Sequence, residues 1–210
     1  MRERYISPSV IRRLPKYHRC LKELENSGIV RVSSDVLAKN LGFTASQVRQ
    51  DFSCFGEFGQ QGYGYNVSSL LAEIAGIIGV DRNHSAVIIG VGNLGRALLN
   101  NFKFKNYGFE ISAAFDTDEN LIGTEIGDVG IHDIERIEEF FQTSPFEVAI
   151  LCVPKAFVRD VARRVAAIGV LGIWNFTNID LSLEELGVVV ENVHFADSLM
   201  TLCYEISKDN

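Results

Sequence analysis

Apolar side chains recur at helical spacing through the first eighty residues, in runs that glycines separate. In the first run Ser7 precedes Pro8, a pair that suits an N-cap and the first helical position. The apolar positions of this run continue to Leu24, and Gly28 follows as a residue that favours a helix end. We therefore expect one long N-terminal helix that ends at Gly28.

Two shorter helices and a glycine-rich segment follow this run. Ser34 is expected to cap a helix that Gly42 closes, and Thr44 is expected to cap the next helix, over residues 45–52. Two short helices joined by a tight turn with glycine are typical of a helix-turn-helix. Glycines recur through residues 59–65, which predicts a hairpin such as the wing of a winged helix. This part of the chain is therefore predicted to be a winged-helix DNA-binding domain.

The rest of the chain alternates apolar strands with amphipathic helices. The strands are expected at residues 86–89, 109–115, 148–153, 172–176 and 188–191, and the helices at 93–102, 134–141 and 157–168. This alternation is typical of a Rossmann-like, doubly wound parallel sheet, so the fold class is α/β. A last amphipathic helix can close its own core or dock on a partner, and the sequence leaves both open. The predicted domains are residues 1–80, 81–195 and 196–210.

Composition and charge indicate a globular protein and separate its two parts. Of the 210 residues 22% are charged, and the net charge is −7. Residues 1–80 hold ten Lys and Arg against seven Asp and Glu, whereas residues 81–210 hold ten against twenty. The basic part is the one expected to meet a polyanion. The sequence shows neither an apolar stretch of transmembrane length nor a signal peptide, so we expect a cytoplasmic protein without a membrane partner.

The segment Gly90-Val91-Gly92-Asn93-Leu94-Gly95 follows an apolar strand and opens a helix. Gly90 suits the tight turn, Gly92 lets the backbone approach a pyrophosphate, and Gly95 lets the helix pack on the strand. The free N–H groups of the helix N-terminus attract phosphate. Asp116 ends the next strand, where a carboxylate can accept both ribose hydroxyls and repel a 2′-phosphate. The motif predicts a cofactor site that favours NAD(H) over NADP(H).

The third predicted helix carries the candidate DNA contacts. Its polar side chains can donate hydrogen bonds to bases or phosphates; they are Ser46, Gln47, Arg49 and Gln50. Val48 and Phe52, four residues apart, are expected to face the core. The N-terminal residues of such a recognition helix face base edges in the major groove. A small helical domain with an ordinary polar surface stays open as an alternative.

No catalytic or metal-binding pattern accompanies the glycine motif in the sequence. The histidines and cysteines stand far apart; they are His18, His84, His132, His194, Cys20, Cys54, Cys152 and Cys203. We therefore expect no catalytic residues and no metal site, and reduced thiols. The rival hypothesis is an NAD-dependent oxidoreductase whose N-terminal part is a cap, which turnover of small alcohols and acids would reveal.

Ordered sequence blocks extend along nearly the whole chain. They are residues 32–34, 45–53, 55–59, 62–67, 90–95, 114–116, 153–154, 172–176 and 190–193. Together these blocks resemble the Rex family of bacterial redox-sensing transcriptional repressors. The resemblance implies a homodimer of winged-helix and Rossmann domains whose last helix is swapped onto the partner subunit. It also implies an inverted-repeat operator in double-stranded DNA, which NADH releases while NAD⁺ competes.

The resemblance extends the candidate sites by single residues. To the cofactor site it adds Val153, Pro154 and Phe195. A hydrophobic ring at Phe195 would favour the neutral dihydronicotinamide over the cationic oxidised ring, because desolvating the charge is costly. To the DNA site it adds the helix cap and the wing, with the residues Thr44, Gln60, Gln61 and Tyr63.

The inter-domain switch of the family corresponds to Arg19, Asn101 and His194. The family usually has Tyr at the second of these positions and Asp at the third. Arg19 cannot form the usual ion pair with a neutral His194, so the switch is expected to be weakened, pH-dependent or differently connected. A Rex-like DNA-binding protein with a weakened redox response therefore stays as a second alternative.

Overall fold

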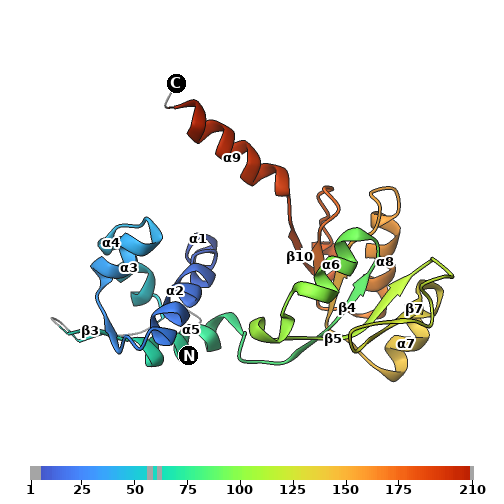
Figure 1. Ribbon diagram of the computed structural model, residues 1–210, viewed down its shortest axis with the longest axis horizontal. Helices are drawn as coiled ribbons and strands as arrows, with labels where there is room; N and C mark the ends of the chain where they lie inside the picture. Colours follow the sequence, from blue (N-terminus) through green and yellow to red (C-terminus); the bar gives the residue numbers. More distant parts are fainter. Residues whose placement is uncertain (1–5, 56–58, 61–62, 209–210) are drawn as a thin grey trace. The chain divides into compact units, whose positions relative to one another are not determined.

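The computed structural model describes residues 6–55, 59–60 and 63–208, and its contacts divide the chain into two compact units (Figure 1). Unit 1 ends at Arg82, and unit 2 begins at Asn83. Each unit buries its own apolar core, as separate domains do.

Unit 1 combines helices with a small antiparallel sheet. Its elements are α1 (Pro8–Ile11), α2 (Leu14–Asn26), β1 (Arg31–Val32), α3 (Ser34–Leu41), α4 (Ala45–Ser53), β2 (Gly59–Gln60), β3 (Gly64–Asn66) and α5 (Val67–Ile78). The strand order is β1-β3-β2. The helix pair α3–α4 and the hairpin β2–β3 occur where the sequence predicts the helix-turn-helix and the wing. The sequence patterns missed β1 and α5.

Side-chain caps set where α3 and α4 begin. Ser33 Oγ accepts the Val36 N–H at 3.2 Å, one residue before the cap predicted at Ser34. Thr44 Oγ1 accepts the Gln47 N–H at 3.1 Å, which confirms the predicted cap. Both bonds satisfy N–H groups that have no acceptor within the helix.

The prediction of one long N-terminal helix is wrong. α1 ends at Ile11 and α2 begins at Leu14, so the chain breaks between them. Pro15 lies in the first turn of α2, where its missing N–H costs no hydrogen bond. In a continuous helix the Pro15 ring would clash with the carbonyl of Ile11, and the break removes that clash.

Unit 2 is a sheet of seven strands with helices on both faces. Its strands and α-helices are β4 (His84–Ile89), α6 (Asn93–Asn101), β5 (Phe109–Asp116), β6 (Glu125–Ile126), β7 (Val129–Asp133), α7 (Ile137–Thr143), β8 (Val148–Leu151), α8 (Val158–Ile168), β9 (Gly172–Asn175), β10 (Val189–Asn192) and α9 (Phe195–Ser207). The strand order is β10-β9-β8-β4-β5-β7-β6. The described strands pair in parallel except β6, a short antiparallel edge that the sequence patterns missed.

Alternate residues of β4 face the two helix layers. Val87 and Ile89 lie in the core that contains residues of α7 and α8. Ala86 and Ile88 lie in the core against which α6 packs. All four side chains are almost fully buried, as expected for the central strand of a doubly wound sheet. The glycine turn therefore follows a rigid strand.

The last helix, α9, is exposed along its whole length. Its apolar side chains include Leu199, Met200 and Leu202, each more than half exposed in the single chain. A helix that leaves so much apolar surface uncovered is typical of an interface. Among the helices of the described residues, none combines the length and apolar character needed to cross a membrane.

Candidate functional site

The glycines of the turn between β4 and α6 differ in what surrounds them. Gly90 has a φ of +93°, and a Cβ there would lie 2.8 Å from the Cys152 carbonyl group. A Cβ at Gly95 would lie 2.0 Å from the Gly90 carbonyl oxygen. A Cβ at Gly92 would meet nothing within 4 Å. Packing within the protein therefore requires Gly90 and Gly95, whereas the space above Gly92 is open to a ligand.

The N-terminus of α6 opens onto this space. Gly92 is the N-cap residue and offers no side chain to the first helical N–H groups, and both Gly92 and Asn93 are exposed. The first-turn N–H groups have no acceptor within the helix, and the helix dipole adds partial positive charge. A pyrophosphate fits this donor set by charge and by hydrogen bonding.

Asp116 connects the end of β5 to the glycine turn. Its carboxylate accepts hydrogen bonds from the backbone N–H groups of Val91 at 2.5 Å, Thr117 at 2.7 Å and Asp118 at 3.0 Å. The carboxylate is thus held beside the turn. Hydrogen bonds from Asn120, first from its backbone N–H, hold the pKa of Asp118 below its usual range. Two carboxylates at this strand end disfavour a 2′-phosphate.

A cavity of about 780 Å³ extends from the glycine turn along the strand ends. Its lining includes five residues that the sequence predicted: Gly90, Gly92, Asp116, Val153 and Pro154. It also includes residues that the sequence reasoning missed, among them Thr117, Ile134, Glu135, Phe157, Asp160 and Arg164. Phe157 follows the turn after β8, so its position at the strand ends was a usable signal. Arg164 lies two turns into α8, and only the folded chain reveals it.

The other predicted cofactor residues lie outside the lining of this cavity. Val91 is fully buried, and Leu94 packs against the same apolar core on the α6 side of the sheet. Both side chains therefore support the turn from within the protein. Gly95 is buried and Asn93 is exposed at the start of α6. Phe195 begins α9, is 57% exposed, and has its ring centroid 5.9 Å from that of Phe176.

The described residues lack the chemistry of a catalytic thiol or a metal centre at this cavity. Burial raises the pKa of the Cys152 thiol to about 12, which suppresses the nucleophilic thiolate. Across the described ranges, no group of three or more His, Cys, Asp and Glu is placed to hold a metal ion.

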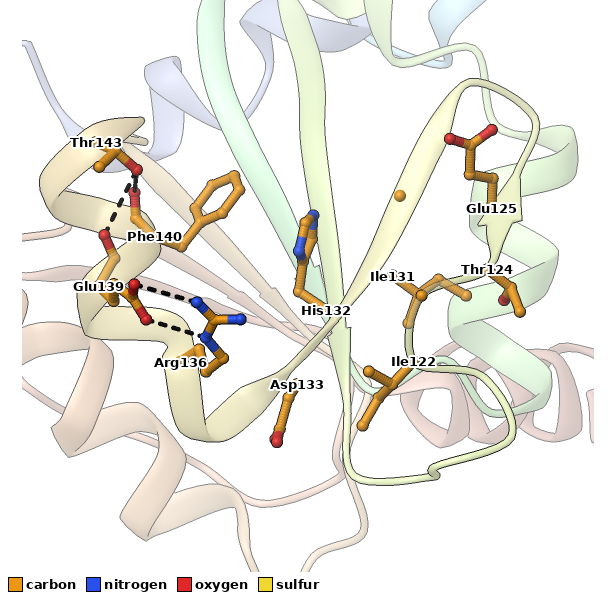
Figure 2. Close-up of a pocket in the computed structure, with 12 residues that line it drawn as sticks. Ile122, Thr124, Glu125, Ile131, His132, Asp133, Arg136, Glu139, Phe140 and Thr143 are labelled. Atoms are coloured by element: carbon orange, nitrogen blue, oxygen red, sulfur yellow. Dashed lines mark hydrogen bonds and ion pairs between the residues drawn. The ribbon is translucent and has the colours of Figure 1, made fainter.

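A second hollow, of about 720 Å³, lies between the β6–β7 hairpin and α7 (Figure 2). His132 points into it, with its ring centroid 5.1 Å from that of Phe140. Arg136 donates to both carboxylate oxygens of Glu139, at 3.0 and 3.1 Å. This cation is neutralised by its neighbour, so the hollow is a poorer phosphate site than the glycine turn.

In unit 1, α4 exposes a polar face. Ser46, Arg49 and Gln50 are exposed, and Gln47 is half-buried. Arg49 donates to Ser34 Oγ at 2.9 Å, which orients its guanidinium along the α3–α4 surface.

The opposite face of α4 packs into the core of unit 1. Val48 and Phe52 are buried, as the sequence predicted. Asp51 is buried beside them, which sequence reasoning missed.

The wing contributes an aromatic side chain, and the adjoining strand β1 contributes a cation beside it. Tyr63 is 69% exposed, and the Arg31 guanidinium lies 6.0 Å from the centre of its ring. Arg31 also donates to the Tyr63 carbonyl at 3.2 Å. Arg31 is a candidate phosphate contact that sequence reasoning missed. Gln60 is in β2, whereas Gln61 lies outside the described residues.

The three predicted switch residues have separate environments in the two units. Arg19 is exposed on α2. Asn101 ends α6 and donates to the Ala97 carbonyl at 3.0 Å. His194 Nε2 lies 2.9 Å from an Asp180 carboxylate oxygen, so an acidic group stands next to this imidazole.

Two family models match the chain, one in each part. The model described as a putative DNA-binding protein N-terminus matches residues 5–53. The model described as a CoA binding domain matches residues 81–179.

Relatives and solved structures match over nearly the full length. The chain is 46% identical over 204 residues to the redox-sensing transcriptional repressor Rex of Caldanaerobacter subterraneus subsp. tengcongensis, covering 97% of this chain and 91% of that protein. It is 48% identical over 207 residues to Rex of Clostridium botulinum, covering 99% of this chain and 98% of that protein.

The structure of RSP in complex with beta-NAD⁺ and operator DNA has a TM-score of 0.90 at 43% identity, covering 98% of this chain and 94% of that one. The structure of RSP in complex with beta-NADH has a TM-score of 0.90 at 41% identity, and the match covers 97% of this chain and 95% of that one. RSP is described as a Rex-family repressor. Because these relatives and solved structures match nearly the whole chain at more than 40% identity, the chain belongs to the Rex family of redox-sensing transcriptional repressors.

Proposed function

We propose that this protein is a homodimeric transcriptional repressor that binds an inverted-repeat operator in double-stranded DNA and releases it when NADH binds. The observation that carries the proposal is the open space at Gly92, which the packing of the chain does not explain. A glycine with room above it, at an uncapped helix N-terminus, suits a dinucleotide pyrophosphate. The relatives' name and the RSP complexes with NADH, NAD⁺ and operator DNA support the same function.

The proposed effector is NAD(H), bound over residues 81–195. The proposed contacts are Gly90, Val91, Gly92, Asn93, Leu94, Gly95, Asp116, Val153, Pro154 and Phe195. The amides at the start of α6 hold the pyrophosphate, and Asp116 accepts the ribose hydroxyls. Asp116 and Asp118 together disfavour NADP(H). Phe195 meets the nicotinamide, where an apolar ring favours the uncharged reduced form.

The proposed DNA-binding surface lies in residues 1–80 and uses α4 and the wing. Its residues are Thr44, Ser46, Gln47, Arg49, Gln50, Gln60, Gln61 and Tyr63, to which we add Arg31. The exposed face of α4 enters the major groove, where the Gln47 side chain hydrogen-bonds to base edges or positions the helix on the operator. Arg49 and Arg31 supply the phosphate contacts that give most of the affinity.

The two sites communicate through linkage. NADH must bind the arrangement that is incompetent for DNA more tightly than the competent one, and DNA must weaken NADH binding by the same factor. Residues 196–210 form the dimerisation helix. This helix is swapped onto the partner subunit, which covers the apolar side chains that the helix exposes in the single chain. The protein acts in the cytoplasm as a regulator and not as an enzyme.

Titration of a duplex, selected from a random-sequence library by the wild-type protein, tests this proposal. We expect NADH to raise the Kd for that duplex and NAD⁺ to oppose the effect of NADH. An unchanged Kd at saturating NADH contradicts redox sensing. Oxidation of NADH, followed at its absorbance band with small carbonyl substrates, would instead favour an oxidoreductase.

A second candidate function is a repressor with a weakened redox response, favoured by His194. The His194 imidazole lies 2.9 Å from the Asp180 carboxylate. The family pattern has an aspartate at position 194 instead of this imidazole. His194→Asp should enlarge the ratio of the DNA Kd values with and without NADH. A ratio equal to that of the wild type contradicts this candidate.

A further inference from the structure

A buried polar cluster joins the recognition helix to the N-terminal helices. Asp51 on α4 is 2% exposed. Arg13 Nε donates to Asp51 Oδ2 at 2.7 Å, and an Arg13 terminal nitrogen donates to Oδ1 at 2.8 Å. Tyr17 Oη, also buried, donates to Oδ2 at 2.8 Å. Both oxygens of one buried carboxylate are thus engaged by donors from more than thirty residues earlier in the chain.

The break between α1 and α2 makes this cluster possible. Arg13 is the N-cap residue of α2 and lies two residues before Pro15. Because the chain turns there, the Arg13 side chain reaches α4 while Tyr17, one turn later, approaches the same carboxylate. Tyr17 is packed between aromatic rings, with centroids 5.6 Å from Phe43 and 4.8 Å from Phe52.

The protonation states suit a permanent clamp. Burial, followed by the hydrogen bond to Asp51, raises the pKa of Tyr17, so its hydroxyl remains a donor. The hydrogen bond to Asp51 raises the pKa of Arg13, so its guanidinium stays charged. Both donors therefore keep their protons at physiological pH.

Stability alone is a poor explanation for this cluster. Replacing a buried ion pair with apolar side chains of similar size is often neutral or stabilising, so the fold itself gains little from these charges. A bidentate guanidinium–carboxylate pair instead fixes direction as well as distance. Val48 and Phe52 hold α4 by apolar contacts, which tolerate small slides and rotations.

We propose that Arg13, Tyr17 and Asp51 form a positioning clamp that sets the rotation of α4 and thereby which side chains meet base edges. This inference rests on the proposed function, because it requires α4 to be the recognition helix. Asp51 lies on the same helix as Gln47, the proposed base contact, and Gln50, whose side chain is exposed. A rotation of α4 about its axis would move these two side chains out of register with the bases. Contacts to phosphates tolerate such a rotation better, because phosphates line the whole groove.

The test uses the full-length dimer and two duplexes of equal length. One is the duplex selected from a random library by the wild-type protein, and the other is a scrambled version of it. The main variant combines Arg13→Met, Tyr17→Phe and Asp51→Leu, which keeps the volume and removes the directional bonds. We expect a folded protein whose Kd ratio between the scrambled and selected duplexes falls about tenfold, with nearly unchanged binding to the scrambled duplex. Loss of stability alone would weaken both duplexes equally.

A second variant keeps the test decisive if the triple variant does not fold. Arg13→Lys retains the charge but replaces the fork with a point charge, so the same fall in the Kd ratio is expected, to a smaller extent. The matched control is Arg136→Met with Glu139→Leu, which removes an ion pair from unit 2 and should leave the ratio unchanged.

Two negative outcomes separate this inference from the proposed function. A wild-type Kd ratio in Arg13→Lys, or in a folded triple variant, overturns the clamp while the repressor function stands. A wild-type protein that selects no duplex overturns the function itself.

Discussion

Replacing Gly92 with alanine should strongly weaken NADH binding and leave the fold intact. The added Cβ meets no protein atom within 4 Å, and Gly92 has a φ of −69°, which alanine adopts without strain. The loss in unfolding free energy is therefore limited to the poorer N-cap, about 1 kcal/mol or less. The methyl group would instead occupy the space in which the pyrophosphate approaches the first amides of α6.

The size of the binding defect follows from the bonds that are displaced. Hydrogen bonds to a charged group contribute about 1.5–3 kcal/mol each. Losing two amide–phosphate bonds should therefore cost about 3 kcal/mol or more, which is a fall of at least about 100-fold in NADH affinity. Isothermal titration calorimetry measures this affinity, and thermal unfolding of the protein without nucleotide measures the fold.

Gly95→Ala is the matched control. Its Cβ would lie 2.0 Å from the Gly90 carbonyl oxygen, so the backbone must move. We expect about 3 kcal/mol of destabilisation, the upper part of the range for overpacking. Wild-type NADH affinity in folded Gly92→Ala would refute the assignment of this turn as the pyrophosphate cradle. Equal thermal stability of Gly92→Ala and Gly95→Ala would refute the distinction between ligand space and packing.

Four further experiments test other parts of the structure. Asp116→Ala should weaken NADH binding about tenfold or more and reduce the ratio of NADH affinity to NADPH affinity, both measured by titration calorimetry. An unchanged affinity ratio would mean that this carboxylate does not recognise the ribose. Arg49→Ala should lower DNA affinity and reduce the slope of log K against log salt by about 0.9, and an unaltered slope means that it contacts no phosphate. Burial raises the pKa of the Cys152 thiol, so alkylation of the folded protein near pH 8 should be far slower than in denaturant; equal rates contradict this shielding. Deleting residues 196–210 should produce a monomer in light scattering, and a persistent dimer means that α9 is not the dimerisation element.

Local rules made much of the fold predictable from the sequence. Thr44 caps α4 because a threonine oxygen satisfies an N–H three residues later, whatever surrounds it. The glycine turn at 90–95 and Asp116 were recognisable because their spacing follows strand and helix geometry. The single helix predicted through Pro15 failed, because the break depends on how the chain on either side of the proline packs.

The sequence by itself determined the two-part organisation, the glycine turn with its acid, and the polar face of α4. The glycine turn and the polar helix face depend on residues within one or two turns of each other, and Asp116 is recognisable because it ends the next strand. Only the tertiary structure decided that Arg13 donates to Asp51, that Arg31 lies over Tyr63, and that Arg164 lines the cavity beside the glycine turn. These groups are far apart in the chain and meet only when the packed core brings their elements together.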